Sequence, residues 1–159
     1  MKITIVSVGK IKEKYLSDAL AEYGKRLSRY CKLEFTEVAD EKTVDKAGEA
    51  LNRQVKEKEG ARILNCLKPD AFVIVLAIEG SMMDSEEFAE KIRRLGVDGV
   101  SHIQFVIGGS LGLAEEVLRR ADLLLSFSRM TFPHQLMRVI LLEQIYRGYR
   151  IISGEPYHK

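Results

Sequence analysis

A buried strand that runs into a glycine turn is the first stretch of this sequence with a chemical use. It reads FVIGGSLGL over residues 105–113. Glycines at a strand end let backbone N–H groups approach a bound cofactor closely. Gly108, Gly109 and Gly112 give the pattern G-G-x-x-G, which is neither the dinucleotide fingerprint G-x-G-x-x-G nor a phosphate loop with Lys-Ser or Lys-Thr. The turn therefore predicts either a ligand outside these two classes or a tight connection without a ligand.

The end of the chain carries polar groups suited to positioning and proton transfer. Glu143 and Arg147 stand four residues apart, so they share one helix face and could orient a substrate or the tail. A surface ion pair is the alternative. The tail ends in Tyr157, His158 and Lys159, which offer a stacking ring, a group titrating near neutrality and a phosphate contact. Terminal residues are also ordinarily frayed, so a tail without a role is the other interpretation.

Three segments with unusual residues follow predicted strands. They are LAIEG at 76–80, IGGSLG at 107–112 and SFSRMTFPHQ at 126–135. Ligands of open α/β sheets bind outside the carboxyl ends of the strands, where all three segments fall. The sequence therefore predicts one site at this edge of the sheet. His102 and His134 begin a strand and a helix without a cluster of further ligands, so no metal site is expected.

Five apolar segments predict the strands that position this site. They cover residues 2–8, 32–38, 71–78, 102–107 and 123–128. Several are nearly continuous apolar runs, as expected of parallel strands buried on both faces. Helical patterns alternate with them, which predicts an α/β fold with a mostly parallel sheet and helices on both faces. We expect one domain over residues 1–159, because neither a linker nor an internal repeat interrupts the pattern.

The helical segments differ in how clearly they begin and end. Apolar residues recur every three to four positions from Tyr15 to Tyr30, which predicts one buried face. Asp84 followed by Glu87 predicts a capping box at the start of the helix after the third strand. The stretch 42–67 has a helical pattern, but two glycines weaken it and leave its ends poorly defined.

The last predicted helix, 134–152, is apolar over more than half of its circumference. A helix of this kind is covered on two sides. The sheet is expected to cover one side. The same helix of a second subunit is the predicted cover of the other, since twofold homodimers are the commonest oligomers. Burial wholly within one chain is the alternative.

The charges are unevenly distributed, although the net charge is only +2. Residues 1–32 hold eight Lys or Arg against three acids, and residues 119–159 hold seven against three. If the two ends meet in space, they form a basic face of the kind that binds nucleic acid. Solvated helix faces without a partner are the equally supported alternative.

The composition, with 46% hydrophobic and 30% charged residues, is typical of a globular protein. Cys31 and Cys66 lack a paired spacing, which predicts free thiols. The run AFVIVLAI at 71–78 is too short to span a bilayer, and the opening MKITIVSVGK lacks the layout of a signal peptide. We therefore expect a cytoplasmic protein without a membrane contact.

Long stretches of the sequence closely resemble one family. They are FVIGGSLGL, the C-terminal LSFSRMTFPHQLMRVILLEQIYRGYRIISGEPYHK, the opening KITIVSVGK and the segment VKEKEGARIL. The family is that of the bacterial methyltransferases of RlmH type, which act on N3 of a pseudouridine in large-subunit ribosomal RNA. They belong to the SPOUT superfamily of trefoil-knotted methyltransferases. The resemblance covers the whole chain, including its length and the terminal PYHK.

The resemblance implies that the glycine turn binds S-adenosyl-L-methionine, in a pocket made by the loops of a C-terminal trefoil knot. Nothing in the periodicity indicates a knot. Carried over by position, the cofactor contacts are Leu76, Gly108, Phe127, Ser128, Arg129, Met130, Thr131 and Phe132. Adenine and methionine need apolar walls and backbone hydrogen bonds, which agrees with these residue types.

Methyl transfer from a sulfonium is an in-line displacement, so its main demand is near-attack geometry, and no metal is required. The ring imide nitrogen of pseudouridine must also lose its proton, which a positioned base or a hydrogen-bond network can assist. The candidates are Glu143, Arg147, Tyr157 and His158. The family further implies 23S ribosomal RNA in the assembled ribosome as substrate, and a tail that closes over the pocket of its own or a partner subunit.

Two other functional classes are compatible with the residues alone. The first, a nucleotide-dependent oxidoreductase, is disfavoured because Gly9 stands alone after the first strand, where a fingerprint should lie. The second is a non-catalytic ribosome-binding or RNA-binding α/β module. It predicts that the protein binds no cofactor tightly.

Overall fold

The computed structural model describes all 159 residues. Its centre is a five-stranded sheet of order β2-β1-β4-β3-β5, in which every neighbouring pair is parallel. The strands are β1 (Lys2–Val8), β2 (Lys32–Val38), β3 (Phe72–Met82), β4 (His102–Ile107) and β5 (Leu123–Ser126). The helices are α1 (Lys14–Leu27), α2 (Glu49–Cys66), α3 (Ser85–Val97), α4 (Glu115–Arg120) and α5 (His134–Ile152).

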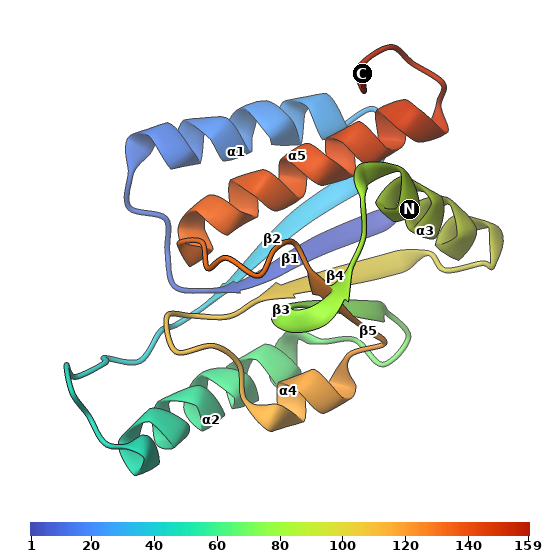
Figure 1. Cartoon of the computed structure of the whole chain (residues 1–159). Coiled ribbons are helices and arrows are strands. Elements are labelled where there is room, and N and C mark those ends of the chain that lie inside the picture. Colours follow the sequence, from blue (N-terminus) through green and yellow to red (C-terminus); the bar gives the residue numbers. More distant parts are fainter.

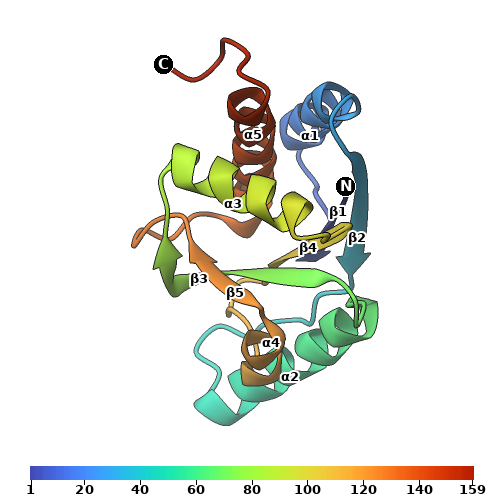
Figure 2. The ribbon, with the colours of Figure 1, turned by 90° about the vertical axis from the view of Figure 1, so that its right-hand side faces the viewer.

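The helices form one layer on each face of the sheet. Figures 1 and 2 show α1, α3 and α5 over one face, and α2 with α4 over the other. Parallel neighbours cannot be joined by a tight hairpin, so crossover helices must return the chain along the sheet. The predicted α/β class, with a parallel sheet and helices on both faces, is confirmed.

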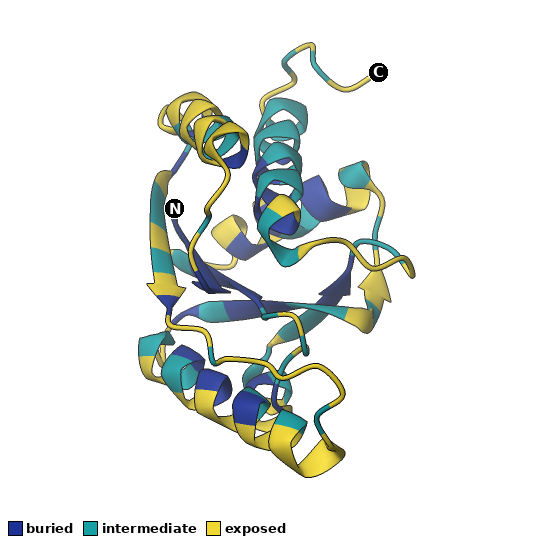
Figure 3. Ribbon diagram, turned by 90° about the vertical axis from the view of Figure 1, so that its left-hand side faces the viewer, coloured by how far each residue is buried: buried dark blue, intermediate teal, exposed yellow.

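A separate apolar core lies between the sheet and each helical layer. Phe105 and Val106 are consecutive in β4 and belong to different cores, because successive side chains of a strand point to opposite faces. Phe105 shares a cluster with Ile145 of α5, whereas Val106 shares one with Ile63 of α2 and Val117 of α4. Figure 3 shows the central strands buried and the helices exposed on their outer sides. Burial on both faces explains the continuous apolar runs of these strands.

β1, β2, β4 and α5 begin and end where the sequence predicts. β3 instead continues to Met82, because its end pairs again with β5 after an irregularity between Leu76 and Ser81. A Cβ at Gly80 would lie 2.7 Å from the backbone of Leu124, so this close approach requires glycine. The polar residues of the extension carry no strand signal, which is why the pattern ends the strand too early.

The start of α3 follows the prediction, and the face of α1 does so only in part. Asp84 and Glu87 form the predicted capping box, in which each side chain accepts the other's backbone N–H at 2.8 Å. Leu16 and Leu27 of α1 are buried, but Tyr15 is 70% exposed. The assignment of Tyr15 to the apolar face is therefore wrong. Tyr15 lies in the first turn of α1, and its side chain points away from the face that buries Leu16 and Leu27.

α2 differs most from its expected bounds. The sequence predicts a helical pattern over residues 42–67, whereas α2 begins at Glu49 and residues 42–48 are not helical. Gly60 lies within this helix and is buried. A Cβ at Gly60 would come within 2.9 Å of the Cβ of Ala114, at the start of α4. The glycine that weakens the helical pattern is thus the residue that lets α2 approach the segment leading into α4.

α5 lies between α1 and α3, and Leu142 and Ile145 on its inner side are fully buried. Tyr149 stacks on Tyr30, which follows α1, with ring centroids 5.5 Å apart, and Tyr146 lies 6.2 Å from the same ring. Part of the apolar circumference is therefore covered within the chain, and the homodimer stays a prediction. None of the helices is long and apolar enough to cross a bilayer.

Candidate cofactor and catalytic site

A cavity of about 400 Å³ opens at the carboxyl ends of β3, β4 and β5. Its walls come from residues 76–79 within β3 and from the ends of β4 and β5 with the loops that follow them, at 107–113 and 125–132 with Arg129 excepted. Leu118 of α4 and His134 and Met137 at the start of α5 complete the lining. All three segments that the sequence places at this edge of the sheet meet here. A cavity of this volume at this edge suits a small organic ligand.

The structure brings most of the predicted cofactor residues to this cavity. Those that line it are Leu76, Gly108, Phe127, Ser128, Met130, Thr131 and Phe132. Arg129 lies in the same loop but is exposed and is absent from the lining. The contacts of these residues with a cofactor stay a prediction.

The loop after β5 is held in place by its own polar groups. β5 ends at Ser126, whose hydroxyl donates to the backbone oxygen of Ser128 at 3.1 Å. The hydroxyl of Ser128 in turn accepts the N–H of Met130 at 3.0 Å. The N–H groups of Ser128 and Thr131 donate to no acceptor within the chain. The loop is thus ordered, yet it keeps donors for a ligand.

Packing and backbone conformation also explain why glycines occupy the turn. A Cβ at Gly108 would lie 2.8 Å from the side chain of Leu113 and 3.2 Å from the oxygen of Gly112. Gly112 has a φ of 88°, a left-handed conformation that favours glycine. The turn is therefore both a tight connection and a wall of the cavity, so a substitution at Gly108 cannot test ligand contact alone.

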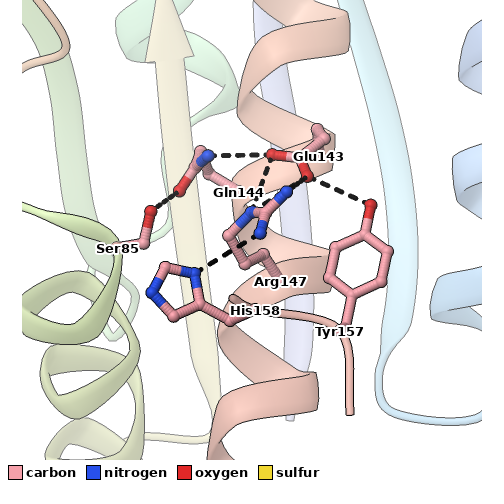
Figure 4. A network of polar contacts seen from close by, with 6 residues as sticks. All are labelled: Ser85, Glu143, Gln144, Arg147, Tyr157 and His158. Atoms are coloured by element: carbon pink, nitrogen blue, oxygen red, sulfur yellow. Dashed lines mark hydrogen bonds and ion pairs between the residues drawn. The ribbon is translucent and has the colours of Figure 1, made fainter.

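A second group of polar side chains gathers on α5 and the tail (Figure 4). Glu143 Oε1 accepts from Arg147 Nη2 at 2.7 Å and from the hydroxyl of Tyr157 at 3.1 Å. Arg147 Nη1 lies 3.4 Å from Nδ1 of His158, and its guanidinium lies 4.6 Å from the ring centroid of Tyr157. The four candidates from the sequence are therefore in contact with one another.

Packing adds two residues that the sequence did not indicate. Gln144 Nε2 donates to Glu143 Oε2 at 2.8 Å, and Gln144 Oε1 accepts from the hydroxyl of Ser85 at 2.7 Å. Burial, and after it the nearby Glu143 carboxylate, raise the pKa of the Tyr157 phenol, so this group stays a hydrogen-bond donor near neutral pH. The hydrogen bond to Glu143 likewise raises the pKa of Arg147, which stays charged.

The cavity and this polar group are separate within one chain. None of the four polar candidates lines the cavity, whose last lining residue on α5 is Met137. Arg147 follows Met137 by ten residues, which corresponds to roughly 15 Å along a helix axis. Cofactor and catalytic candidates therefore form two sets rather than one site in the single chain.

Arg138 is a further residue of this region that the sequence patterns did not indicate. Its side chain is only 2% exposed, and Nη2 donates to the backbone oxygens of Val8 at 2.9 Å and Gly9 at 2.7 Å. Glu37 provides the nearest carboxylate, 3.7 Å away. The guanidinium fastens α5 to the carboxyl end of β1, beside the cavity wall. A charged residue on the buried side of an apolar helix was the signal available in the sequence.

The basic ends of the chain do meet, because α1 packs beside α5. Most arginines of the C-terminal segment, however, are paired with carboxylates or buried, as are Arg120, Arg138, Arg147 and Arg150. Lys10, Lys12 and Lys25 are exposed and form no ion pair. Of the two basic ends, the N-terminal segment therefore holds more of the unpaired positive charge.

The remaining candidates lie elsewhere or have other partners. His102 contacts the hydroxyl of Thr4 at 2.9 Å, at the end of the sheet opposite the cavity. Burial lowers the pKa of His134, which lines the cavity. Both cysteines are free thiols, as predicted. No group of three or more His, Cys, Asp or Glu side chains is arranged to hold a metal ion.

Known proteins resemble this chain over its full length. The family model described as "Predicted SPOUT methyltransferase" matches residues 1–158. Proteins named "Ribosomal RNA large subunit methyltransferase H" from Bifidobacterium adolescentis, Bifidobacterium animalis subsp. lactis and Clostridium kluyveri are 67%, 64% and 58% identical over 159 residues. Each alignment covers 100% of both chains.

Two solved structures share the fold at low sequence identity. A "probable methylase family protein" from Haemophilus influenzae Rd KW20 is 16% identical, with a TM-score of 0.56 over 99% of this chain and 70% of its own. A Legionella pneumophila protein assigned as a methyltransferase, solved with the cofactor SAM, is 10% identical. Its TM-score is 0.51 over 94% of this chain and 66% of its own.

Proposed function

Because the chain belongs to the SPOUT methyltransferases, and among them to the ribosomal RNA large subunit methyltransferase H proteins, we propose that it methylates ribosomal RNA with S-adenosyl-L-methionine. The proposed target is N3 of a pseudouridine in 23S ribosomal RNA, in an intersubunit stem-loop of the assembled ribosome. Such a substrate would place the protein in the cytoplasm. One observation carries the proposal: the cavity where residues 76–79 of β3 meet the loops that follow β4 and β5.

The lining of this cavity fits the cofactor. Leu76, Phe127 and Phe132 supply apolar walls, and the N–H groups of Ser128 and Thr131 are free to donate. Adenine needs this combination, and no pyrophosphate cradle is required. A C-terminal trefoil knot that shapes these loops is part of the proposal, on the strength of family membership.

When bound, S-adenosyl-L-methionine supplies a methyl group on a sulfonium sulfur. The ring of Tyr157 is proposed to stack on the target base, while the ion pair of Arg147 with Glu143 keeps that ring in place. His158 is proposed to take the imide proton as the bond from carbon to N3 forms. The S–C bond breaks in the same step, so charge and atoms balance.

A homodimer would unite the two sets of residues. The tail and the cavity lie apart within one chain, so we propose that the tail of one subunit closes over the cavity of its partner. The apolar side chains of Met130 and Leu136 stand exposed beside the cavity, Met130 at 73%. Exposed apolar residues at a site's rim favour a subunit interface. Only the dimer then has complete sites.

Two measurements test the proposed function. Calorimetry should detect S-adenosyl-L-methionine binding without added metal, which a non-catalytic ribosome-binding module would not show. Mass spectrometry of 23S ribosomal RNA from a host without the gene should show one pseudouridine that has lost a methyl group. Ribosomes from that host should regain the methyl group when the purified protein and cofactor are added. Unchanged RNA in the deleted host would refute the proposal.

A further inference from the structure

The tail is attached to the body of the protein at a point outside the polar group of Figure 4. Glu155 lies two residues before Tyr157. Its Oε1 accepts the hydroxyl of Tyr30 at 2.7 Å, and its Oε2 pairs with the guanidinium of Arg150. Arg150 also donates to the hydroxyl of Tyr30 at 3.3 Å, which closes the triangle. A residue just after α1 thus holds the root of the tail.

The surroundings favour a lasting contact over a fluctuating surface pair. The side chains of Arg150 and Glu155 are 17% and 27% exposed. The ring of Tyr30 stacks on Tyr149 with an angle of 12° between the planes, and the guanidinium of Arg29 lies 5.2 Å from its centroid. Partial burial strengthens an ion pair. Because stacking already restricts the ring of Tyr30, little conformational entropy is lost when its hydroxyl forms a hydrogen bond. The hydrogen bond from Tyr30 lowers the pKa of Glu155, which is therefore ionised at neutral pH.

The backbone around Glu155 is fixed as well. Gly154 adopts a φ of 64°, and the N–H groups of Gly154 and Glu155 donate to Ile151 at 3.0 Å and Arg150 at 2.9 Å. These bonds end α5 and reverse the chain. Arg150 Nη2 donates to the oxygen of Pro156 at 3.3 Å, and the proline ring fixes its own φ.

Tyr157 follows directly after this fixed segment. Consecutive Cα atoms are about 3.8 Å apart, so the position of Pro156 leaves Tyr157 a small volume to occupy. From there on, Tyr157 contacts Glu143 at 3.1 Å, the ring of Tyr146 and the guanidinium of Arg147, and His158 lies 3.4 Å from Arg147 and 3.9 Å from Glu86. Without the attachment at Glu155, these contacts would have to order a frayed end by themselves.

We propose that Tyr30, Arg150 and Glu155 form a latch that positions Tyr157 and His158 for methyl transfer. Tyr30 and Glu155 are then positioning residues, although neither touches the cavity. This inference rests on the proposed function. It holds whether the tail serves the cavity of its own chain or that of a second copy, because the latch fixes the tail at its root.

Two conservative variants loosen the latch, and each has a matched control. Tyr30→Phe keeps the stacked ring and removes only the hydroxyl, and Tyr15→Phe removes a hydroxyl from an exposed ring without a hydrogen bond. Glu155→Gln removes a charge at the latch. Glu116→Gln does so at an exposed pair with Arg119 on α4. All four proteins are compared as full chains, by hydrogen exchange of the Gly154 and Glu155 amides, which are hydrogen-bonded in the structure, and by kcat and KM on unmethylated ribosomes.

In both latch variants the amides of Gly154 and Glu155 should exchange about tenfold faster than in wild type, the effect of losing one charge-assisted hydrogen bond. Their kcat should fall by about tenfold, while cofactor affinity stays within about twofold of wild type. The two changes combined should cost less than the product of their separate effects, since both act on one contact. The controls should match wild type in both measurements.

Three results would count against the inference in different ways. Unchanged tail exchange in an active enzyme would show that there is no latch. Faster exchange with wild-type kcat would show a latch that does not position the catalytic groups. A wild-type protein that binds the cofactor yet methylates no ribosome would refute the proposed function and the catalytic part of the inference together.

Discussion

Glu143 is the residue on which the candidate catalytic side chains converge. Its oxygens accept from Arg147, Tyr157 and Gln144, so its carboxylate is saturated by donors in the free protein. A saturated carboxylate is better suited to holding its neighbours in place than to abstracting a proton. His158 has two long contacts, 3.4 Å to Arg147 and 3.9 Å to Glu86, and is the freer group. This difference assigns orientation to Glu143 and proton transfer to His158 within the proposed mechanism.

His158→Ala should therefore lower kcat far more than it lowers cofactor affinity. Loss of a proton-transfer group costs roughly a hundredfold or more in rate, whereas the cavity proposed to bind the cofactor lies elsewhere in the chain. Single-turnover methylation and calorimetry measure the two quantities separately. His102→Ala, at the opposite end of the sheet, is the control and should leave both near wild type. Equal losses of rate and affinity would place His158 in cofactor binding instead.

The two cysteines should differ in reactivity because their surroundings differ. Burial raises the pKa of the Cys31 thiol to about 11, and its side chain belongs to the core beneath α1 and α5. Cys66 is half-buried at the end of α2. At about pH 8 a thiol reagent should label Cys66 alone, and Cys31 only after denaturant is added. Cys66→Ser should thus leave a folded protein that resists labelling, and rapid labelling of this variant would contradict the burial of Cys31.

Some contacts of the candidate site depend on how helices and strands pack together, so single residues do not predict them. The i to i+4 spacing was enough to pair Glu143 with Arg147, since a helix dictates that contact. Ser85 reaches Gln144 only because α3 packs against α5, and such a contact has no local pattern. The same holds for Tyr30 and Glu155, which the packing of α1 on α5 brings together. The sequence therefore predicted the order and type of the elements, but not the start of α2, the ends of β3 and β5 or the exposure of Tyr15. Contacts between side chains of different elements required the structure.

Gly60 and Gly148 allow a test of why α2 and α5 keep glycine. Alanine at either position should gain up to about 1 kcal/mol from helix propensity. A Cβ at Gly148 would lie 3.6 Å from its nearest neighbour, Ala89, which is an ordinary contact. At Gly60 it would lie 2.9 Å from Ala114 and force α2 away from the segment before α4. Gly148→Ala should raise the free energy of unfolding by roughly 0.5 kcal/mol, whereas Gly60→Ala should lower it by roughly 1–3 kcal/mol.

Chemical denaturation of the two variants measures these changes directly. A shared sign would contradict the assignment, because the helix propensity term is common to both. A stabilised Gly60→Ala in particular would mean that α2 can move at no cost, so the glycine would have no packing role. A destabilised Gly148→Ala would point to closer contact between α3 and α5 than the 3.6 Å separation indicates.

At the scale of the whole molecule, α5 contacts three different parts of the structure. Its inner side packs on the sheet, its flanks pack on α1 and α3, and its first turns reach the cavity. The apolar pattern of the helix predicts contact with a second subunit. Helices of the same chain, however, cover much of this apolar surface. Leu142 and Ile145 are fully buried in the core, so a charge there would unfold the chain rather than separate subunits.

The proposed dimer is better tested at the exposed rim beside the cavity. Leu136→Glu places a charge on a side chain that is exposed in the single chain, so folding should be unaffected. The desolvation of this charge at an apolar interface should weaken association by at least about tenfold. Sedimentation should therefore find dimers for wild type and monomers for the variant at micromolar concentration. Val97→Glu, at an exposed apolar residue of α3, is the control. A monomeric wild type would refute the dimer itself.

Ribosome binding should depend on the unpaired lysines of the N-terminal segment. Lys10, Lys12 and Lys25 keep their charge available, while most arginines near the C-terminus are paired or buried. Each phosphate contact contributes roughly 0.7–0.9 to the slope of log affinity against log salt concentration. Replacing all three lysines by glutamine should reduce the magnitude of that slope by about 2 and leave cofactor binding unchanged. The matched control replaces Arg53, Lys56 and Lys58, which have the same total charge and form no ion pair but lie on α2, across the sheet from α1. If the control lost more affinity than the lysine variant, the RNA would have to approach the opposite face of the sheet, where neither the tail nor the latch could reach it.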